Sequence, residues 1–240
     1  RGNFRFAASR TLSLSSGSTA GTFENMKAAK SANAGTPSAP HEPYHKGNVP
    51  ERLLQAAERI LKTETVEDIT ARRLCREVGV TSANFYNHYP SLDYLLLEIA
   101  AKGFAARAGL MKKILKSDLP VEDKVVTCAV KTVELSLKEP QLFRLMYGYI
   151  KNRGQNENYE KQADKSLAIL THIVYGEDIY RADDVVWSHE NCQKAYAIFS
   201  FIYGLAVAIS NNLISNPSGT RKAMLDLVED LTRTYLKGLV

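Results

Sequence analysis

Cysteine is scarce in this chain, and its copies are widely separated. Only three of the 240 residues are cysteine, namely Cys75, Cys128 and Cys192. This spacing provides neither a CxxC metal pair nor the even, closely spaced set of a secreted disulfide scaffold. We therefore expect a reducing compartment and predict a cytoplasmic protein.

Motifs of catalysis and metal binding are missing as well. The sequence contains no GxGxxG fingerprint, no Walker sequence and no GxSxG elbow. Residues 189–193 begin like the zinc motif HExxH, but Gln193 replaces the second histidine, so the ligand pair is incomplete. We predict no bound metal, no cofactor and no enzymatic activity.

The chain also lacks a hydrophobic run long enough to cross a bilayer. The uncharged stretch at 195–210, AYAIFSFIYGLAVAIS, contains Ser200, Gly204 and Ser210. It is shorter than the ~20 apolar residues that a spanning helix needs. We expect a buried bundle helix and no membrane. Because apolar residues surround this helix on nearly all sides, we also expect contact with a second copy of the chain.

The positive charge is concentrated at the N-terminal end. The whole chain has a net charge of +5, yet residues 1–50 alone hold six Lys or Arg against two acidic residues. Overall basicity is therefore only a weak indication of nucleic-acid binding. Residues 1–48 are rich in Ser, Gly and Pro, and we predict that they form a disordered basic tail.

Apolar residues recur at helical spacing from residue 49 onward. In the first segment they include Leu53, Leu54, Ala57, Ile60 and Leu61, which predicts a helix from Pro50 to about residue 63. No alternating pattern bounded by hairpin turns is present, so the predicted fold class is all-α. Longer helical segments are expected at about 91–116, 120–138, 140–151, 158–175, 184–212 and 218–238.

Two short helices are predicted close together, at about 70–78 and 82–88. Thr70 and Thr81 are expected to cap them, and Gly79 to end the first. Cys75 falls where the two helices would come closest. The intervening Gly79-Val80-Thr81 predicts the tight turn of a helix-turn-helix, whose second helix can enter the DNA major groove.

The motif in this region resembles a known family. Residues 75–91, CREVGVTSANFYNHYPS, are similar to the signature of the TetR family of bacterial transcriptional regulators, approximately A-x-x-x-G-V-S-x-x-x-L-Y-x-H-F-x-S. The stretches YHKGN at 44–48, LFRLMYG at 142–148 and FIYGL at 201–205 more loosely resemble the branch with a WHG-type C-terminal domain. Leu92 departs from the pattern, because the family commonly has a phosphate-binding Lys there. Lys46 and the basic tail are candidates to compensate for it.

The residues around the turn can be assigned roles on DNA. Ser82 and Asn84 are predicted to read base edges, Asn being suited to a bidentate pair with adenine. The resemblance implies backbone contacts at Tyr86 and His88, although Tyr86 can alternatively cover the small core of the motif. Asn87 can alternatively be a solvated polar residue. The complete predicted DNA-binding set is Lys46, Thr70, Arg72, Thr81, Ser82, Asn84, Tyr86, Asn87 and His88.

The remainder of the chain is interpreted through the same resemblance. It implies a three-helix helix-turn-helix DNA-binding domain at 49–97, followed by a helical-bundle domain at 98–240 that binds a ligand and dimerises. A small apolar or aromatic effector would lie in a cavity, although aromatic residues at helical spacing also form ordinary cores. The predicted ligand-binding residues are Tyr147, His172, Trp187 and Tyr203. The last two helices are expected to pair with those of a partner through Phe201, Leu205, Ile209, Leu227 and Leu231.

The resulting hypothesis is a homodimeric repressor that a small molecule releases from a palindromic operator. Two alternatives remain open on the sequence. A DNA-binding protein of the same fold could act without a ligand and use its helical body to dock a protein partner. A helical enzyme or small-molecule carrier is the third possibility, although no set of residues with base and nucleophile spacing supports it.

Overall fold

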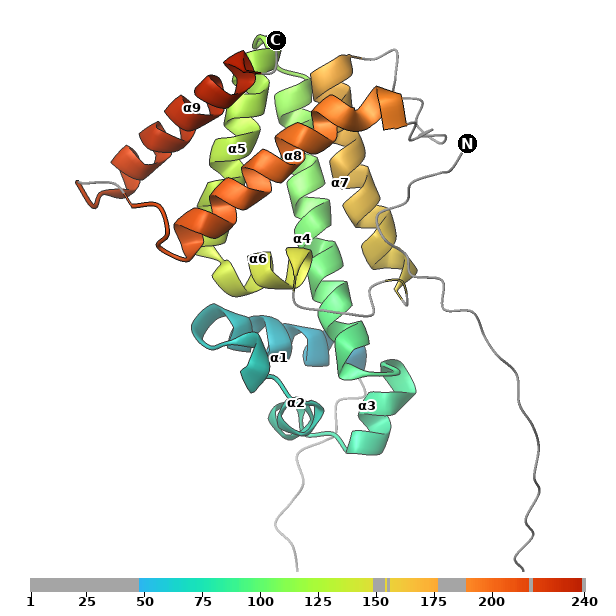
Figure 1. The fold of residues 1–240 in the computed structure, drawn as a ribbon. Helices are drawn as coiled ribbons and strands as arrows, with labels where there is room; N and C mark the ends of the chain where they lie inside the picture. Colours follow the sequence, from blue (N-terminus) through green and yellow to red (C-terminus); the bar gives the residue numbers. More distant parts are fainter. Residues whose placement is uncertain (1–47, 149–153, 155, 177–188, 216–217, 239–240) are drawn as a thin grey trace, which may run out of the picture.

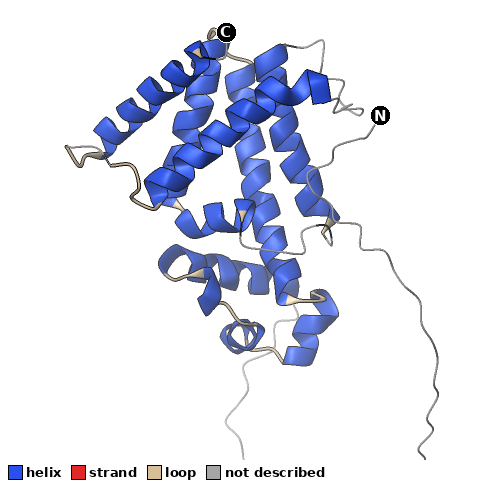
Figure 2. Ribbon diagram, viewed as in Figure 1, coloured by secondary structure: helices blue, strands red, loops and turns tan. Residues whose placement is uncertain are grey.

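The described part of the chain is entirely helical. A computed structural model describes residues 48–148, 154, 156–176, 189–215 and 218–238. Within these residues every regular element is a helix and no strand is present, as Figure 2 shows. The predicted all-α fold class is therefore confirmed. The tail at 1–47, including Lys46, and the predicted ligand residue Trp187 lie outside the described residues.

The helices fall into a small group at one end of the molecule and a larger bundle at the other (Figure 1). The small group holds the first three helices, and α4 runs from it into the bundle. The elements are α1 (Val49–Thr63), the 3-10 turn η1 (Val66–Asp68), α2 (Ala71–Val78), α3 (Ser82–His88), α4 (Leu92–Leu115), α5 (Val121–Lys138), α6 (Pro140–Tyr147), α7 (Glu157–Tyr175), α8 (His189–Ser210) and α9 (Arg221–Lys237).

Side-chain caps explain where several of these helices begin. In each case an oxygen of the capping side chain accepts the backbone N–H three residues further along, which satisfies a donor that the first turn leaves free. Ser91 caps α4 in this way, with 3.0 Å between its Oγ and the nitrogen of Tyr94. The residues that cap helices by this contact are Thr70, Thr81, Ser91, Asn156 and Thr220.

Two apolar clusters form the interior, and α4 contributes to both. The first cluster joins α1, α2 and α3 to the N-terminal half of α4, and it also takes in Leu145, Met146 and Tyr159 from the bundle. The second joins the C-terminal half of α4 to α5, α7 and α8. The predicted domain boundary at residues 97 and 98 therefore falls inside a continuous buried helix.

A close contact between α4 and α6 requires a residue without a side chain. A Cβ atom added at Gly103 would lie 2.7 Å from Sδ of Met146 and 3.1 Å from a methyl carbon of Leu142. Met146 is fully buried and has little room to move. Glycine at this position therefore allows α6 to lie directly against α4, beside the first group of helices.

Helix α8 crosses the bundle and contacts α5 and α7 (Figure 1). The sequence predicts that the uncharged stretch at 195–210 is too short to cross a membrane, yet among the described residues the segment Gln193–Ser210 has the length and composition of a spanning helix. One third of that segment is buried inside the protomer. Six residues of α8 are buried, and all except Ala195 belong to the second core: Ala195, Ile198, Ile202, Leu205, Ala206 and Ile209. These buried side chains are the part of α8 that packs into the bundle.

Gly79 allows a test of the turn between α2 and α3. Its φ of 74° is in the left-handed region, and a Cβ atom added there would meet nothing within 4 Å, so the backbone conformation alone opposes a side chain. We expect Gly79→Ala to lower the free energy of unfolding by about 1 to 2 kcal/mol. Urea denaturation followed by circular dichroism measures this change.

Gly109, inside α4, is the matched control. It is exposed, and a Cβ atom there would also meet nothing within 4 Å, but its backbone is ordinary helix. Gly109→Ala should therefore raise the free energy of unfolding by up to about 1 kcal/mol. Equal effects of the two substitutions would contradict the described turn.

Candidate functional site

The helix-turn-helix is built from local contacts that the sequence predicts. Oγ1 of Thr70 accepts the N–H of Arg73 at 3.1 Å, and Oγ1 of Thr81 accepts the N–H of Asn84 at 3.2 Å. Between the two caps, Gly79 ends α2 in the left-handed conformation. The thiol of Cys75 lies 3.6 Å from the carbonyl oxygen of Thr81, so a small side chain occupies the crossing of the helices.

The start of α3 and its outer side are exposed and polar. Phe85 is completely buried beneath the helix, while Tyr86 leaves 57% of its surface accessible and contacts the ring of Phe85 by its edge. The remaining predicted contacts at the start and on the outer side of α3 are also exposed, and they are Thr81, Ser82, Asn87 and His88. Thr70 and Arg72 are exposed at the start of α2. The structure thus brings eight of the predicted DNA-binding residues to one pair of short helices, and all but Asn84 are exposed.

Asn84 differs from its neighbours on α3. It is half-buried, and its Oδ1 atom is enclosed without a hydrogen-bond partner in the described structure. A buried amide oxygen without a partner is costly, so this side chain has a free-energy reason to rotate or to find a donor. Its placement at the third position of a seven-residue helix keeps it close to the exposed N-terminal turn.

Charged side chains around the motif hold it in place. The guanidinium of Arg73 pairs with Glu64 at 2.6 Å and with Glu77 at 3.1 Å, and its hydrogen bond lowers the pKa of Glu64 below the usual value. Nη2 of Arg52 donates to the carbonyl oxygen of Val78 at 2.7 Å, which joins α1 to the end of α2. The contacts of Arg73 with Glu64 and of Arg52 with Val78 are not visible in the sequence pattern, because the partners are remote in the chain.

Two residues that follow α3 in the chain, Tyr89 and Leu92, pack in or against the first core. Tyr89 is buried directly after the helix, and its hydroxyl donates to the carbonyl oxygen of Pro50 at 3.0 Å. Leu92, the departure from the family pattern, packs against the first core. Its side chain therefore contributes apolar contact at the start of α4, where the family pattern has a charged group.

The bundle is joined to the small group of helices through α6. Arg144 forms a two-pronged ion pair with Glu67 of η1, at 2.6 and 2.9 Å, and its hydrogen bond lowers the pKa of the Glu67 carboxyl. Oε1 of Gln141 accepts the N–H of Val66 at 3.3 Å. A shift of α6 would therefore displace η1, which lies directly before α2 in the chain.

The predicted ligand-binding residues of the bundle lie in packed surroundings. Tyr147 and Tyr203 belong to an aromatic cluster, with ring centroids 5.4 Å apart, and both also lie near Phe143 and Phe199. Burial raises the pKa of the Tyr147 hydroxyl. His172 is half-buried on α7.

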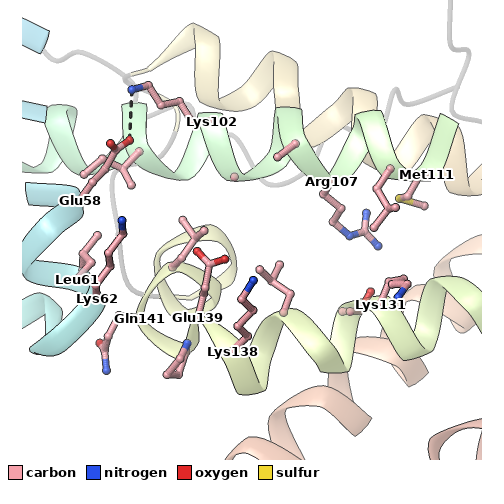
Figure 3. Close-up of a pocket in the computed structure, with 18 of the residues that line it drawn as sticks. Glu58, Leu61, Lys62, Lys102, Arg107, Met111, Lys131, Lys138, Glu139 and Gln141 are labelled. Atoms are coloured by element: carbon pink, nitrogen blue, oxygen red, sulfur yellow. Dashed lines mark hydrogen bonds and ion pairs between the residues drawn. The ribbon is translucent and has the colours of Figure 1, made fainter. Parts of the chain in front are cut away.

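A cavity of about 1020 Å³ opens elsewhere, between α4 and α5, with α6 and the end of α1 at one end (Figure 3). Within the described residues its wall does not include Tyr147, His172 or Tyr203, so their ligand role stays a prediction. The sequence pattern did not identify its lining residues, which include Arg107, Leu110, Met111 and Cys128. A signal was available, since Arg107 interrupts the apolar stripe formed by Phe104, Met111 and Ile114.

The predicted dimer residues divide into two groups. Leu205 and Ile209 are buried in the second core of the protomer itself, which leaves them little surface to offer a partner. Phe201 is half-buried and stacks on Tyr235 of α9 with ring centroids 4.1 Å apart. Leu227 and Leu231 are also half-buried and lie four residues apart on α9. In the part of the chain described, no cluster of three His, Cys, Asp or Glu residues could hold a metal ion.

Solved structures with similar folds are known. A protein of unknown function from Rhodococcus sp. RHA1 matches with a TM-score of 0.63 and 23% identity, over 82% of this chain and 98% of that one. A TetR transcriptional regulator from the same organism matches with a TM-score of 0.55 and 16% identity, over 77% and 95%. The reduced form of E. coli NemR matches with a TM-score of 0.53 and 14% identity, over 78% and 97%.

These likenesses define the fold of the chain. The described helices have the fold of TetR-type transcriptional regulators. No family model and no curated protein matches the sequence, and the identities to the solved structures are low. The resemblance to the WHG-type branch stays a prediction.

Tyr89 provides a pH-dependent test of the support beneath α3. Burial raises its pKa to about 12, above the ordinary value of about 10. The stability that the neutral phenol contributes should be complete below pH ~10 and should be lost as the pH rises toward 12, because only the unfolded chain ionises easily there. Between pH 8 and pH 11 the urea midpoint should thus fall more in the native protein than in Tyr89→Phe. A parallel fall in both would contradict this assignment.

Proposed function

We propose that the chain is a sequence-specific DNA-binding transcriptional regulator, and that it acts as a homodimeric repressor in the bacterial cytoplasm. The observation that carries the proposal is the construction of α3. Thr81 caps this short helix, Phe85 and Tyr89 anchor it from beneath, and its outer side is exposed and polar. A helix presented in this way can enter the major groove of B-DNA, which is ~12 Å wide.

The exposed residues divide into two kinds of contact. Ser82 and Asn84, in the first turn of α3, would read base edges, and a donor on a base would satisfy the enclosed oxygen of Asn84 once that side chain turns outward. The other residues would bind phosphates, which positions the protein without reading sequence. They are Thr70, Arg72, Thr81, Tyr86, Asn87 and His88.

Dimerisation would place two copies of α3 one DNA turn apart, at ~34 to 36 Å, on a palindromic operator. The face proposed for the contact lies on α8 and α9, where Phe201, Leu227, Leu231 and Tyr235 are half-buried in the single protomer. Apolar side chains that remain partly exposed on two adjacent long helices suit a symmetric four-helix contact. Nη2 of Arg233 on α9 pairs with Oδ1 of Asp123 on α5 at 2.7 Å, and this ion pair helps to hold α9 against α5.

We further propose that residues 49–97 bind DNA and that residues 98–240 regulate this binding. A small-molecule effector in the cavity would contact Gln141 and Leu142 of α6, the helix that also holds η1 through Arg144. An effector that favours the arrangement incompatible with DNA would release the operator. A coupling of about 1 to 3 kcal/mol corresponds to a 5 to 150-fold loss of affinity.

The DNA-binding proposal is tested by selecting bound sequences from a random duplex pool and measuring affinities by fluorescence anisotropy. Asn84→Ala should reduce the preference for the selected site over a scrambled one by about 1 to 3 kcal/mol, because a base contact is lost. Arg72→Gln should weaken binding to both sequences and lower the salt dependence, because a phosphate contact is lost.

Lys113→Gln is the control for these variants. Lys113 is exposed in the last turn of α4, away from the helix-turn-helix, and its loss should leave both affinities unchanged. Equal affinity of the native protein for selected and scrambled DNA would refute sequence-specific binding.

Dimerisation is tested separately by sedimentation velocity. We expect the native protein to sediment as two chains and Leu231→Glu to shift toward the 26.7 kDa of one chain, because a buried unpaired carboxylate opposes the contact. Leu119→Glu is the control, since Leu119 is 45% exposed in the connection between α4 and α5. A native protein that stays a single chain at micromolar concentration would rule the proposed dimer out.

A further inference from the structure

The cavity between α4 and α5 is large, elongated and partly apolar. Its lining residues on α4 extend from Ile99 to Ile114, roughly 22 Å of helix, and its volume of about 1020 Å³ is at the upper end for small-molecule sites. Apolar side chains make much of the wall, and one of them, Leu110, is 38% exposed. The apolar lining residues include Leu61, Ile99, Leu110, Met111, Leu135 and Leu142.

Arg107 enters this cavity from the middle of α4 (Figure 3). It lies on the same side of the helix as the buried residues Phe104 and Met111, and it is itself half-buried. Its guanidinium donates to the hydroxyl of Ser166 on α7, which is a neutral acceptor. In the described part of the chain no carboxylate forms an ion pair with Arg107.

The other charged side chains of the described wall either pair with a neighbour or are exposed to solvent. Lys102 pairs with Glu58 at 3.2 Å, and Lys131 pairs with Glu134 at 2.7 Å, so these two cations have partners. Glu64 pairs with Arg73 at 2.6 Å. The remaining charged lining residues are exposed to solvent, and they are Lys62, Lys138 and Glu139.

The thiol of Cys128, which lines the cavity from α5, cannot neutralise Arg107 either. Burial raises the pKa of the Cys128 thiol to about 11, so it is uncharged at neutral pH. A half-buried cation that faces a partly apolar hollow without a counter-charge is unfavourable, and a bound anion would remove that cost.

We propose that this cavity binds an amphipathic monocarboxylate, with its carboxylate on Arg107 and its apolar body along the α4 and α5 walls. A guanidinium presents paired N–H donors that match the two oxygens of a carboxylate. Among the described lining residues Arg107 is the only cation that is not exposed to solvent, and one such cation balances one negative charge, which favours a carboxylate over a phosphate dianion. The idea that this monocarboxylate is the effector rests on the proposed regulatory function. Its binding in the cavity can be measured without DNA.

Isothermal titration calorimetry on the full chain tests the proposal with three probes. Dodecanoate has both the charge and the apolar body, dodecanol has only the apolar body, and butyrate has the charge with a short body. We expect dodecanoate to bind about 10-fold to 100-fold more tightly than dodecanol, because a charge-assisted hydrogen bond is added. Butyrate should bind more weakly than dodecanoate, because it leaves most of the apolar wall uncovered.

Substitution of Arg107 should remove the preference for the charged probe. In Arg107→Met we expect dodecanoate and dodecanol to bind with similar affinity, while Lys112→Met, an exposed change on the same helix, should keep the native preference. Leu110→Glu provides a second variant that does not disturb the contact with Ser166. Its carboxylate should repel dodecanoate and weaken it by at least about 10-fold.

The outcomes separate this inference from the proposed function. Equal binding of dodecanoate and dodecanol by the native protein, no binding of either, or a preference that survives in Arg107→Met would overturn the monocarboxylate site. If the native protein gave such a result and still bound selected DNA, the proposed DNA-binding regulator would remain supported and only the monocarboxylate site would be refuted. Selective binding of dodecanoate by a protein that ignores DNA would support the site and refute the regulator.

Discussion

Helix α4 is the element on which the rest of the structure depends, because one continuous buried stripe takes part in both apolar clusters. Leu95, Leu96 and Ile99 pack with the first three helices, whereas Ala108, Met111 and Ile114 pack within the bundle. A rigid helix shared in this way cannot tilt at one end without displacing the other. The two ends of the molecule are therefore mechanically connected by packing.

The second connection is polar and runs through α6. Gly103 lets α6 lie against α4, and from there Arg144 and Gln141 reach η1 just before the helix-turn-helix. The ion pair between Arg144 and Glu67 is exposed and contributes little to stability. Its importance is geometric, because it ties the position of α6 to the start of α2, and the cavity opens beside the same helix.

Local rules account for much of the fold. Thr70, Gly79 and Thr81 mark the ends of α2 and α3 in the sequence, and the structure places the helices at those bounds because caps and left-handed turns act over three or four residues. The buried position of Phe85 follows from the same short-range pattern. The half-buried state of Asn84 does not, since it depends on how α3 lies against its neighbours.

The sequence by itself therefore determined the helical class, the bounds of the short helices and the set of polar residues around the turn, because each depends on spacing within one segment. Only the tertiary structure decided that Tyr147 and Tyr203 share a packed aromatic cluster, that Leu205 and Ile209 are buried within the protomer, and that Arg107 faces a cavity. Those outcomes depend on contacts between helices far apart in the chain, such as Arg107 of α4 with Ser166 of α7. Helical periodicity identifies which side of a helix is apolar, and it carries no information about which helix will cover that side.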